Sequence, residues 1–188
     1  MTPTRSARRT RLTRRAAALA AMVAAAALLP APAAHAASST TCTGTTHVTY
    51  TPGLTLTPQT VTVDETDTIT SCTSTDSTIT GINTGGPFSY SVPNAACNYV
   101  EANPAGGGQL TIHWNNGQTS TLTGLVSELT ATGGIVQNIA TGTVTAGEFT
   151  GAAAAITWAY PLVNPLQCLA PGGLTTQNGT ILVQITGA

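Results

Sequence analysis

Short segments in which apolar and polar residues alternate recur from position 48 to the end of the chain. In one of them, Leu110, Ile112 and Trp114 are separated by Thr111 and His113. A period of two residues predicts β-strands that bury one face, and no long segment shows the period of about 3.6 residues that marks an amphipathic helix. Similar segments, separated by Gly, Pro and Asn, lie at 48–50, 61–63, 68–72, 119–130, 135–145, 153–160 and 180–186. The pattern predicts an all-β fold, with a two-sheet antiparallel sandwich of immunoglobulin-like character as the favoured architecture.

One hairpin can be predicted in detail, around the turn Asn115-Asn116-Gly117. A two-residue loop would pair Leu110 with Thr123, whereas a three-residue loop pairs Leu110 with Leu122. Directly opposed residues share one face of a sheet, so the second register joins two apolar side chains. It also places Gly117 where such a loop needs a left-handed residue. We therefore expect the three-residue loop.

The chain contains four cysteines: Cys42, Cys72, Cys97 and Cys168. An even number in an exported chain predicts two disulfides, and none of the four lies in a C-x-x-C pair of the kind used for redox or metal binding. Of the three possible pairings we favour Cys42–Cys72 with Cys97–Cys168, because it joins neighbours in chain order. The second bridge would then link the segments 85–108 and 160–179, which lack alternation and are predicted to be irregular.

The first 36 residues have the parts of an export signal. A basic region is followed by an apolar run, 16–29, and then by the small-residue sequence Ala34-His35-Ala36. This order predicts cleavage before Ala37, which leaves residues 37–188 as one β-sandwich domain. General secretion is favoured over twin-arginine export, because Arg14-Arg15 is followed by three alanines. The apolar run is too short to stay as a membrane span, so we expect a secreted, extracellular protein.

All the basic residues of the chain lie in the predicted signal: Arg5, Arg8, Arg9, Arg11, Arg14 and Arg15. The full chain has a net charge of −1, but residues 37–188 carry seven acidic side chains and no Lys or Arg. Such a surface cannot neutralise phosphates, so we expect neither nucleic acid nor an anionic membrane as a partner. A surface rich in Thr, Ser, Asn and Gln suits a neutral polysaccharide or a protein partner instead.

Acidic residues are clustered at one place, Asp64, Glu65 and Asp67, with Asp76 nearby. Oxygen ligands on a turn could hold Ca²⁺, but the spacing lacks the D-x-[DN]-x-[DN]-G pattern of a calcium loop. We therefore interpret Asp64-Glu65 as a solvated hairpin turn and predict no metal site.

Two histidines remain after the predicted cleavage, His47 and His113. Each lies on the polar face of its strand, opposite residues such as Val48 and Ile112. Exposed surface histidines are the favoured interpretation, and a hydrolase that uses His113 as an acid–base group is the alternative. The sequence has neither the G-x-S-x-G motif of serine hydrolases nor the H-E-x-x-H motif of zinc peptidases. We predict no catalytic residue and no cofactor.

The two tryptophans lie on alternating segments. Trp158 and Tyr160 continue the alternation of Ile156, and Trp114 follows Ile112 in the same way. An aromatic face of this kind can stack on sugar rings, but it is also typical of a strand that faces the core. Burial in the core is the favoured interpretation for both tryptophans.

Three further aromatic residues lie in the segment 85–108, which is predicted to be a loop: Phe88, Tyr90 and Tyr99. Loops carried on a rigid scaffold often supply binding residues, which makes these three the candidate ligand-binding side chains. Packing around the Cys97–Cys168 bridge is the competing explanation for them.

Several segments have a familiar composition: the Arg/Ala-rich leader, residues 50–54 after Cys42, the turn 114–117 and residues 142–149. In these the chain resembles the small secreted Thr/Ala/Gly-rich proteins of actinobacteria. In its acidic, secreted, two-disulfide character it is also similar to the enediyne chromophore-carrier apoproteins, which have an immunoglobulin-like fold. The second resemblance implies a carrier of small molecules, and neither resemblance assigns a functional residue.

The sequence thus predicts a secreted, non-enzymatic β-sandwich protein that acts through surface or ligand binding. A carbohydrate-binding module or a carrier of a small molecule such as a chromophore is the first alternative. The hydrolase that uses His113 is the second.

Overall fold

A computed structural model describes residues 38–83, 88–97 and 108–187. They form eight strands and a short helix, α2 (Pro165–Cys168), between the last two strands. The strands are β1 (Ser39–Leu54), β2 (Gln59–Ser74), β3 (Phe88–Ala95), β4 (Gly108–His113), β5 (Thr119–Thr132), β6 (Ile135–Gly147), β7 (Ala153–Pro161) and β8 (Leu174–Thr186). Within the described ranges no helix is long and apolar enough to cross a membrane. The all-β prediction is confirmed.

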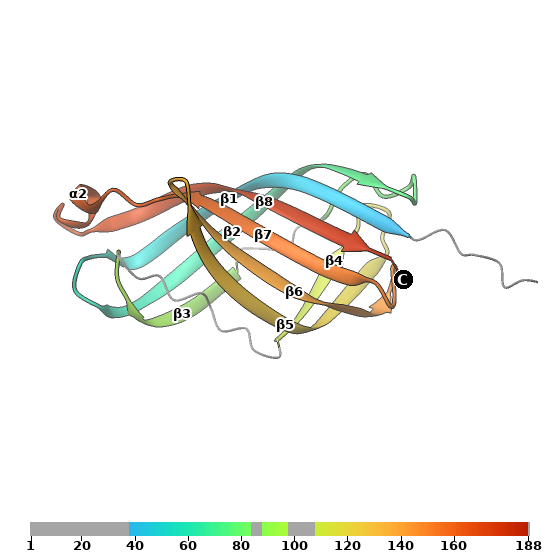
Figure 1. Ribbon diagram of the computed structural model, residues 1–188, viewed down its shortest axis with the longest axis horizontal. Coiled ribbons are helices and arrows are strands. Elements are labelled where there is room, and N and C mark those ends of the chain that lie inside the picture. The colour runs from blue at the N-terminus through green and yellow to red at the C-terminus, as the bar shows by residue number, and fades with distance from the viewer. Residues whose placement is uncertain (1–37, 84–87, 98–107, 188) are drawn as a thin grey trace, which may run out of the picture. The chain divides into compact units, whose positions relative to one another are not determined.

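The strands form one antiparallel sheet in the order β3-β2-β1-β8-β7-β6-β5-β4. Figure 1 shows this sheet strongly twisted and curled over itself, so that one face is concave. The architecture therefore differs from the predicted two-sheet sandwich, because the long strands bend and supply both walls of the core themselves. At one end the free edge of β4 meets the segment after β2, where Ile82 pairs with Trp114 and the backbone N–H of Asn83 donates to the carbonyl of His113 at 2.7 Å.

The predicted hairpin register is confirmed. Leu110 pairs with Leu122, and Gly117 adopts a left-handed φ of 86°. The backbone N–H of Trp114 donates to the carbonyl of Gln118 at 2.8 Å, which closes the three-residue loop. The register of this hairpin is therefore set by the turn residues and by the pairing of two leucines on one face of the sheet.

Both predicted disulfides are also confirmed. Cys42–Cys72 joins the paired strands β1 and β2, with a Cα–Cα distance of 4.0 Å. Cys97–Cys168 joins the segment after β3 to the end of α2, with a Cα–Cα distance of 6.2 Å. No cysteine is free.

Three local predictions are wrong. Asp64-Glu65 is not a turn, because β2 runs without interruption from Gln59 to Ser74. The segment 85–108 is not wholly irregular, because it contains β3. The segment 160–179 contains α2 and the first residues of β8. In each case polar residues or prolines in the segment led to the prediction of a turn or an irregular segment. Pairing with the neighbouring strands stabilises a strand there nevertheless.

Two apolar clusters fill the concave face of the sheet. The first, which we call the tryptophan cluster, surrounds Trp114 and contains Leu122, Val144, Ile156 and Ile185. The second, the tyrosine cluster, is built from Val48, Val61, Val63 and Leu174 with Tyr50 and the partly buried Tyr90 and Tyr160. The candidate site lies where the two clusters meet.

Candidate functional site

Two carboxyl groups lie on the concave face of the sheet, Glu65 and Asp67 on β2. Because successive side chains of a strand point to opposite faces, they continue the buried series of Val61 and Val63 and precede Ile69. Glu65 is 8% exposed and Asp67 is 7% exposed. We call these two residues the acid pair.

The residues beside the acid pair come from the neighbouring strands. Thr46 on β1 pairs with Asp67 on one side and with Gly179 of β8 on the other. Gly179 leaves room for the ring of Tyr160, since a Cβ at position 179 would lie 2.6 Å from Tyr160 Cδ1. The hydroxyls of Thr46 and Tyr160 are hydrogen-bonded at 3.3 Å. A narrow polar belt thus crosses the concave face between the two apolar clusters.

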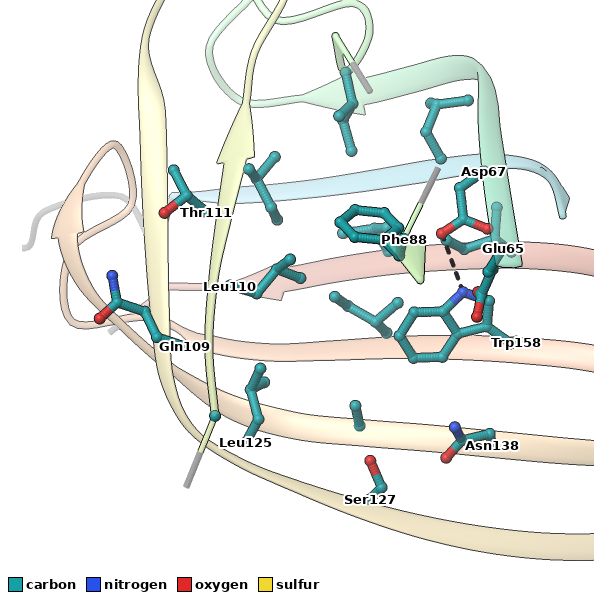
Figure 2. Close-up of a pocket in the computed structure, with 18 of the residues that line it drawn as sticks. Glu65, Asp67, Phe88, Gln109, Leu110, Thr111, Leu125, Ser127, Asn138 and Trp158 are labelled. Carbon is teal, nitrogen blue, oxygen red and sulfur yellow. Dashed lines mark hydrogen bonds between the residues drawn. The ribbon is translucent and has the colours of Figure 1, made fainter. Parts of the chain in front are cut away.

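Each carboxyl of the acid pair accepts one hydrogen bond from an aromatic side chain. Tyr90 Oη donates to Glu65 Oε2 at 3.2 Å, and Trp158 Nε1 donates to Asp67 Oδ2 at 3.2 Å. The second oxygens, Glu65 Oε1 and Asp67 Oδ1, are buried and have no hydrogen-bond partner among the described residues. Figure 2 shows the bond from the indole of Trp158 and places both carboxyls beside that ring.

Burial and mutual repulsion make the acid pair reluctant to ionise. Burial raises the pKa of Glu65 to about 7, and the negative charge of Asp67 adds to this shift. Burial also raises the pKa of Asp67, although the nearby Thr46 hydroxyl and the hydrogen bond from Trp158 act in the opposite direction. No Lys or Arg follows Arg15 in the sequence, so residues 16–188 offer neither side chain to offset a charge here.

A cavity of about 520 Å³ opens beside the acid pair. Figure 2 shows Glu65, Asp67 and Trp158 at one end of it, and Leu110 and Leu125 at the other. Seven aliphatic residues line the remaining wall: Ile69, Ile82, Ile112, Ala140, Ile156, Ile181 and Val183. Polar residues also line it, among them Asn83, Ser89, Gln109, Thr111, His113 and Ser127. Asn138, which pairs with Trp158 across β6 and β7, contributes a third buried side-chain oxygen without a partner. The arrangement is an apolar chamber with an acidic end.

The aromatic residues predicted to bind a ligand lie partly on this cavity. Phe88, 43% exposed, and the half-buried Tyr90 both line it, but they belong to strand β3 and not to a loop. Tyr99 lies outside the described residues. Pairing of β3 with β2 sets Tyr90 opposite Val63, which directs its hydroxyl to Glu65.

The two tryptophans differ. Trp114 is fully buried in the core, as predicted. Trp158 is only partly buried, because one part of its ring forms the cavity wall. Alternation alone predicts on which face of the sheet a residue lies. It does not predict whether other side chains pack against that face or a cavity remains there.

The other candidate side chains are not part of a reactive arrangement. His47 is exposed, as expected, and its Nδ1 lies 2.8 Å from Asn178 Oδ1. His113 is exposed at the end of β4, and within the described ranges it makes no hydrogen bond to a carboxylate. Asp76 accepts hydrogen bonds from the backbone and hydroxyl of Thr78, which lower its pKa. In the part of the chain that the structure describes, no three His, Cys, Asp or Glu residues come together as metal ligands.

Sequence reasoning missed the acid pair, although a signal for it was present. Threonines occupy alternate positions on both sides of the acidic cluster, at 60, 62, 66, 68 and 70. In a strand they would all lie on one face, and Glu65 and Asp67 would lie on the other. That unbroken alternation predicts one long strand with Glu65 and Asp67 on its apolar face. We nevertheless predicted a turn, because acidic side chains without a partner are seldom buried in a core.

Comparison with known proteins adds no assignment. No protein-family model matches the sequence, and no curated protein or solved structure matches it either. The function therefore has to be argued from the cavity and its chemistry.

Proposed function

We propose that the chain is an extracellular, non-enzymatic binding protein whose cavity holds a small and largely apolar molecule. The observation that carries the proposal is the chamber of about 520 Å³ on the tryptophan cluster, whose exposed wall is mainly apolar. Cavities of roughly 300–1,000 Å³ with a few directed polar groups are typical of small-molecule sites. This is the carrier function that was the first alternative from the sequence.

The chemistry of the wall favours an apolar ligand over the other candidates. A polysaccharide site needs an open polar surface along a sugar, whereas this is a chamber of about 520 Å³ with a mainly apolar exposed wall. A hydrolase that uses His113 needs a carboxylate in reach of that ring, and the acid pair bonds to Tyr90 and Trp158 instead. Two disulfides support an oxidising, extracellular compartment, in agreement with the export signal proposed from the sequence.

Binding of the neutral fluorophore N-phenyl-1-naphthylamine, which brightens in apolar surroundings, tests the proposal. Ser127→Trp is the variant that fills the cavity, because Ser127 lies on its wall. Val126→Trp is the matched control, because Val126 neighbours it on β5 but is 62% exposed. We expect the mature, oxidised protein to bind the probe, and Ser127→Trp to weaken binding about tenfold or more. Val126→Trp should bind like the parent protein.

The result is decisive in both directions. Absence of binding, or equal binding by the two tryptophan variants, would contradict a ligand chamber at this place. Circular dichroism of each variant ensures that a loss of binding is not a loss of fold.

A further inference from the structure

All the buried side-chain nitrogen or oxygen atoms without a partner in the described ranges are acceptors, and all three belong to residues of one cavity. They are Glu65 Oε1, Asp67 Oδ1 and Asn138 Oδ1. A buried acceptor left unpaired is costly, and native structures contain few of them. A ligand that brings hydrogen-bond donors into this chamber would satisfy these acceptors if their side chains turn toward it.

The charge at this end of the chamber has no counterpart in the chain. The donors that reach the acid pair from the walls, Tyr90 and Trp158, are neutral. Residues 16–188 contain no Lys or Arg that could approach. Buried carboxylates are normally paired with a cation. When the acid pair is ionised, a balancing positive charge therefore has to come from a group other than Lys or Arg of residues 16–188, and a ligand in the cavity can bring it.

We propose that the ligand is a hydrophobic amine, whose protonated nitrogen binds Glu65 and Asp67 while its apolar body fills the rest of the cavity. This inference rests on the proposed carrier function and names its ligand class. An ammonium group supplies donors together with charge, and hydrogen bonds between charged partners are the stronger kind.

The aromatic residues on the wall fit the same ligand. The indole of Trp158 lies beside the acid pair, and the ring of Phe88, which is 43% exposed, also lines the cavity. Aromatic faces attract organic cations through their quadrupole. A bare metal ion fits less well, because the chamber is far larger than an ion and its acid pair is not joined by a third His, Cys, Asp or Glu within the described ranges.

The pH dependence of such binding follows from the groups that face the acid pair. These are the tyrosines Tyr50 of β1, Tyr90 of β3 and Tyr160 of β7, whose pKa values are all raised by burial and by the charge of Glu65. They stay neutral through the neutral pH range, and His113, which also lines the cavity, is exposed. Since burial raises the pKa of Glu65 to about 7, affinity for an amine should increase as the pH rises through that value.

The test compares two dansyl probes of the same scaffold on the mature, oxidised protein. Dansylcadaverine carries a primary amine that is protonated at about pH 8, and its N-acetyl derivative is neutral. Energy transfer from tryptophan to the dansyl group reports binding of both. We expect the amine to bind about tenfold or more tightly than the neutral probe, and this preference to shrink at about pH 5.5.

Variants locate the preference. The double variant Glu65→Gln, Asp67→Asn keeps side-chain size and an acceptor for Tyr90 and Trp158, and it should reduce the preference for the amine to about one. Asp64→Asn is the matched control, since it removes one charge from the same strand on the opposite face. It should keep the preference of the parent protein.

The outcomes separate this inference from the proposed function. If N-phenyl-1-naphthylamine binds but the two dansyl probes bind alike, the amine inference is wrong and the carrier function survives. If none of the three probes binds, both proposals fail. A third outcome is that the two dansyl probes bind alike and that calcium binds through Glu65 and displaces dansylcadaverine. This result would overturn the proposal of an amine ligand in favour of a metal ion.

Discussion

Trp114 and Trp158 both donate their indole N–H to an oxygen on the concave face, but the bonds lead to different surroundings. Trp114 Nε1 donates to Ser120 Oγ at 2.8 Å, and Ser120 Oγ donates in turn to the carbonyl of Glu148 at 2.7 Å. The ring of Phe149 packs edge-on against Trp114, with ring centroids 5.6 Å apart and planes at 79°. Every polar group in this chain of contacts has a partner, although other members of the same cluster, such as Ile112 and Ile156, border the cavity.

Trp158 donates to a carboxyl whose other oxygen has no partner. Asp67 lies next to Glu65, which is in the same situation, and the cavity begins at that point. A satisfied polar network rigidifies a core, whereas an unsatisfied one costs stability. Buried polar groups are normally hydrogen-bonded. Where a protein departs from this at one place only, that place is often a functional site. The comparison therefore assigns Trp114 to stability and supports the proposal that the surroundings of Trp158 bind a ligand.

The largest effect expected from this comparison is on the free energy of unfolding. Trp114→Ala should lower it by about 4 kcal/mol, because the ring is fully buried and its loss leaves a cavity. Trp158→Ala should lower it by only about 1–2 kcal/mol, because the partly exposed ring already borders empty space. Urea unfolding followed by circular dichroism measures both. Equal losses would mean that the two sites have the same structural role.

A smaller effect concerns pH. Because the pKa of Glu65 is raised in the folded protein to about 7 from 4.5, the folded state binds the proton more tightly than the unfolded chain does. The contribution of Glu65 to stability is therefore complete at acidic pH and is lost as the pH rises from about 4.5 to 7. The loss is on the order of 3 kcal/mol, and the raised pKa of Asp67 acts in the same direction.

Unfolding in urea at several pH values measures this dependence. Glu65→Gln should flatten it, and Asp64→Asn should not, because Asp64 lies on the other face of β2. A parent protein whose stability rises across this range would show that the acid pair is stabilised as a charged pair, against the account given above.

The two regions differ in how much of their structure could be predicted from the sequence. Around Trp114 each local signal agrees with the fold: alternation, the Asn-Asn-Gly turn and the register of Leu110 with Leu122. The pairing of cysteines by chain order also agrees. The hairpin features depend on neighbours in the chain or on one strand pair, so they can be predicted, whereas the Cys97–Cys168 bridge joins residues 71 positions apart.

Around Trp158 the signals conflict. Glu65 and Asp67 follow the alternation of β2, yet their type is typical of a solvated turn. Their burial depends on strands far away in sequence, since Thr46, Tyr90 and Trp158 come from β1, β3 and β7. The curvature that turns one sheet into a chamber is likewise a property of the whole sheet. The cavity and its acidic end could therefore not be predicted from local patterns.

The stability of the double variant Glu65→Gln, Asp67→Asn tests the central claim most directly. If the acid pair is kept for binding, replacing it by neutral side chains of the same size should raise the free energy of unfolding at about pH 7.5, by about 1–2 kcal/mol. The amide oxygens still accept from Tyr90 and Trp158, and the amide N–H groups take the places of the two unpartnered oxygens, so the buried charge is removed at nearly constant size. A double variant that is less stable than the parent protein at that pH would contradict the account, because the acid pair would then be part of what holds the fold together.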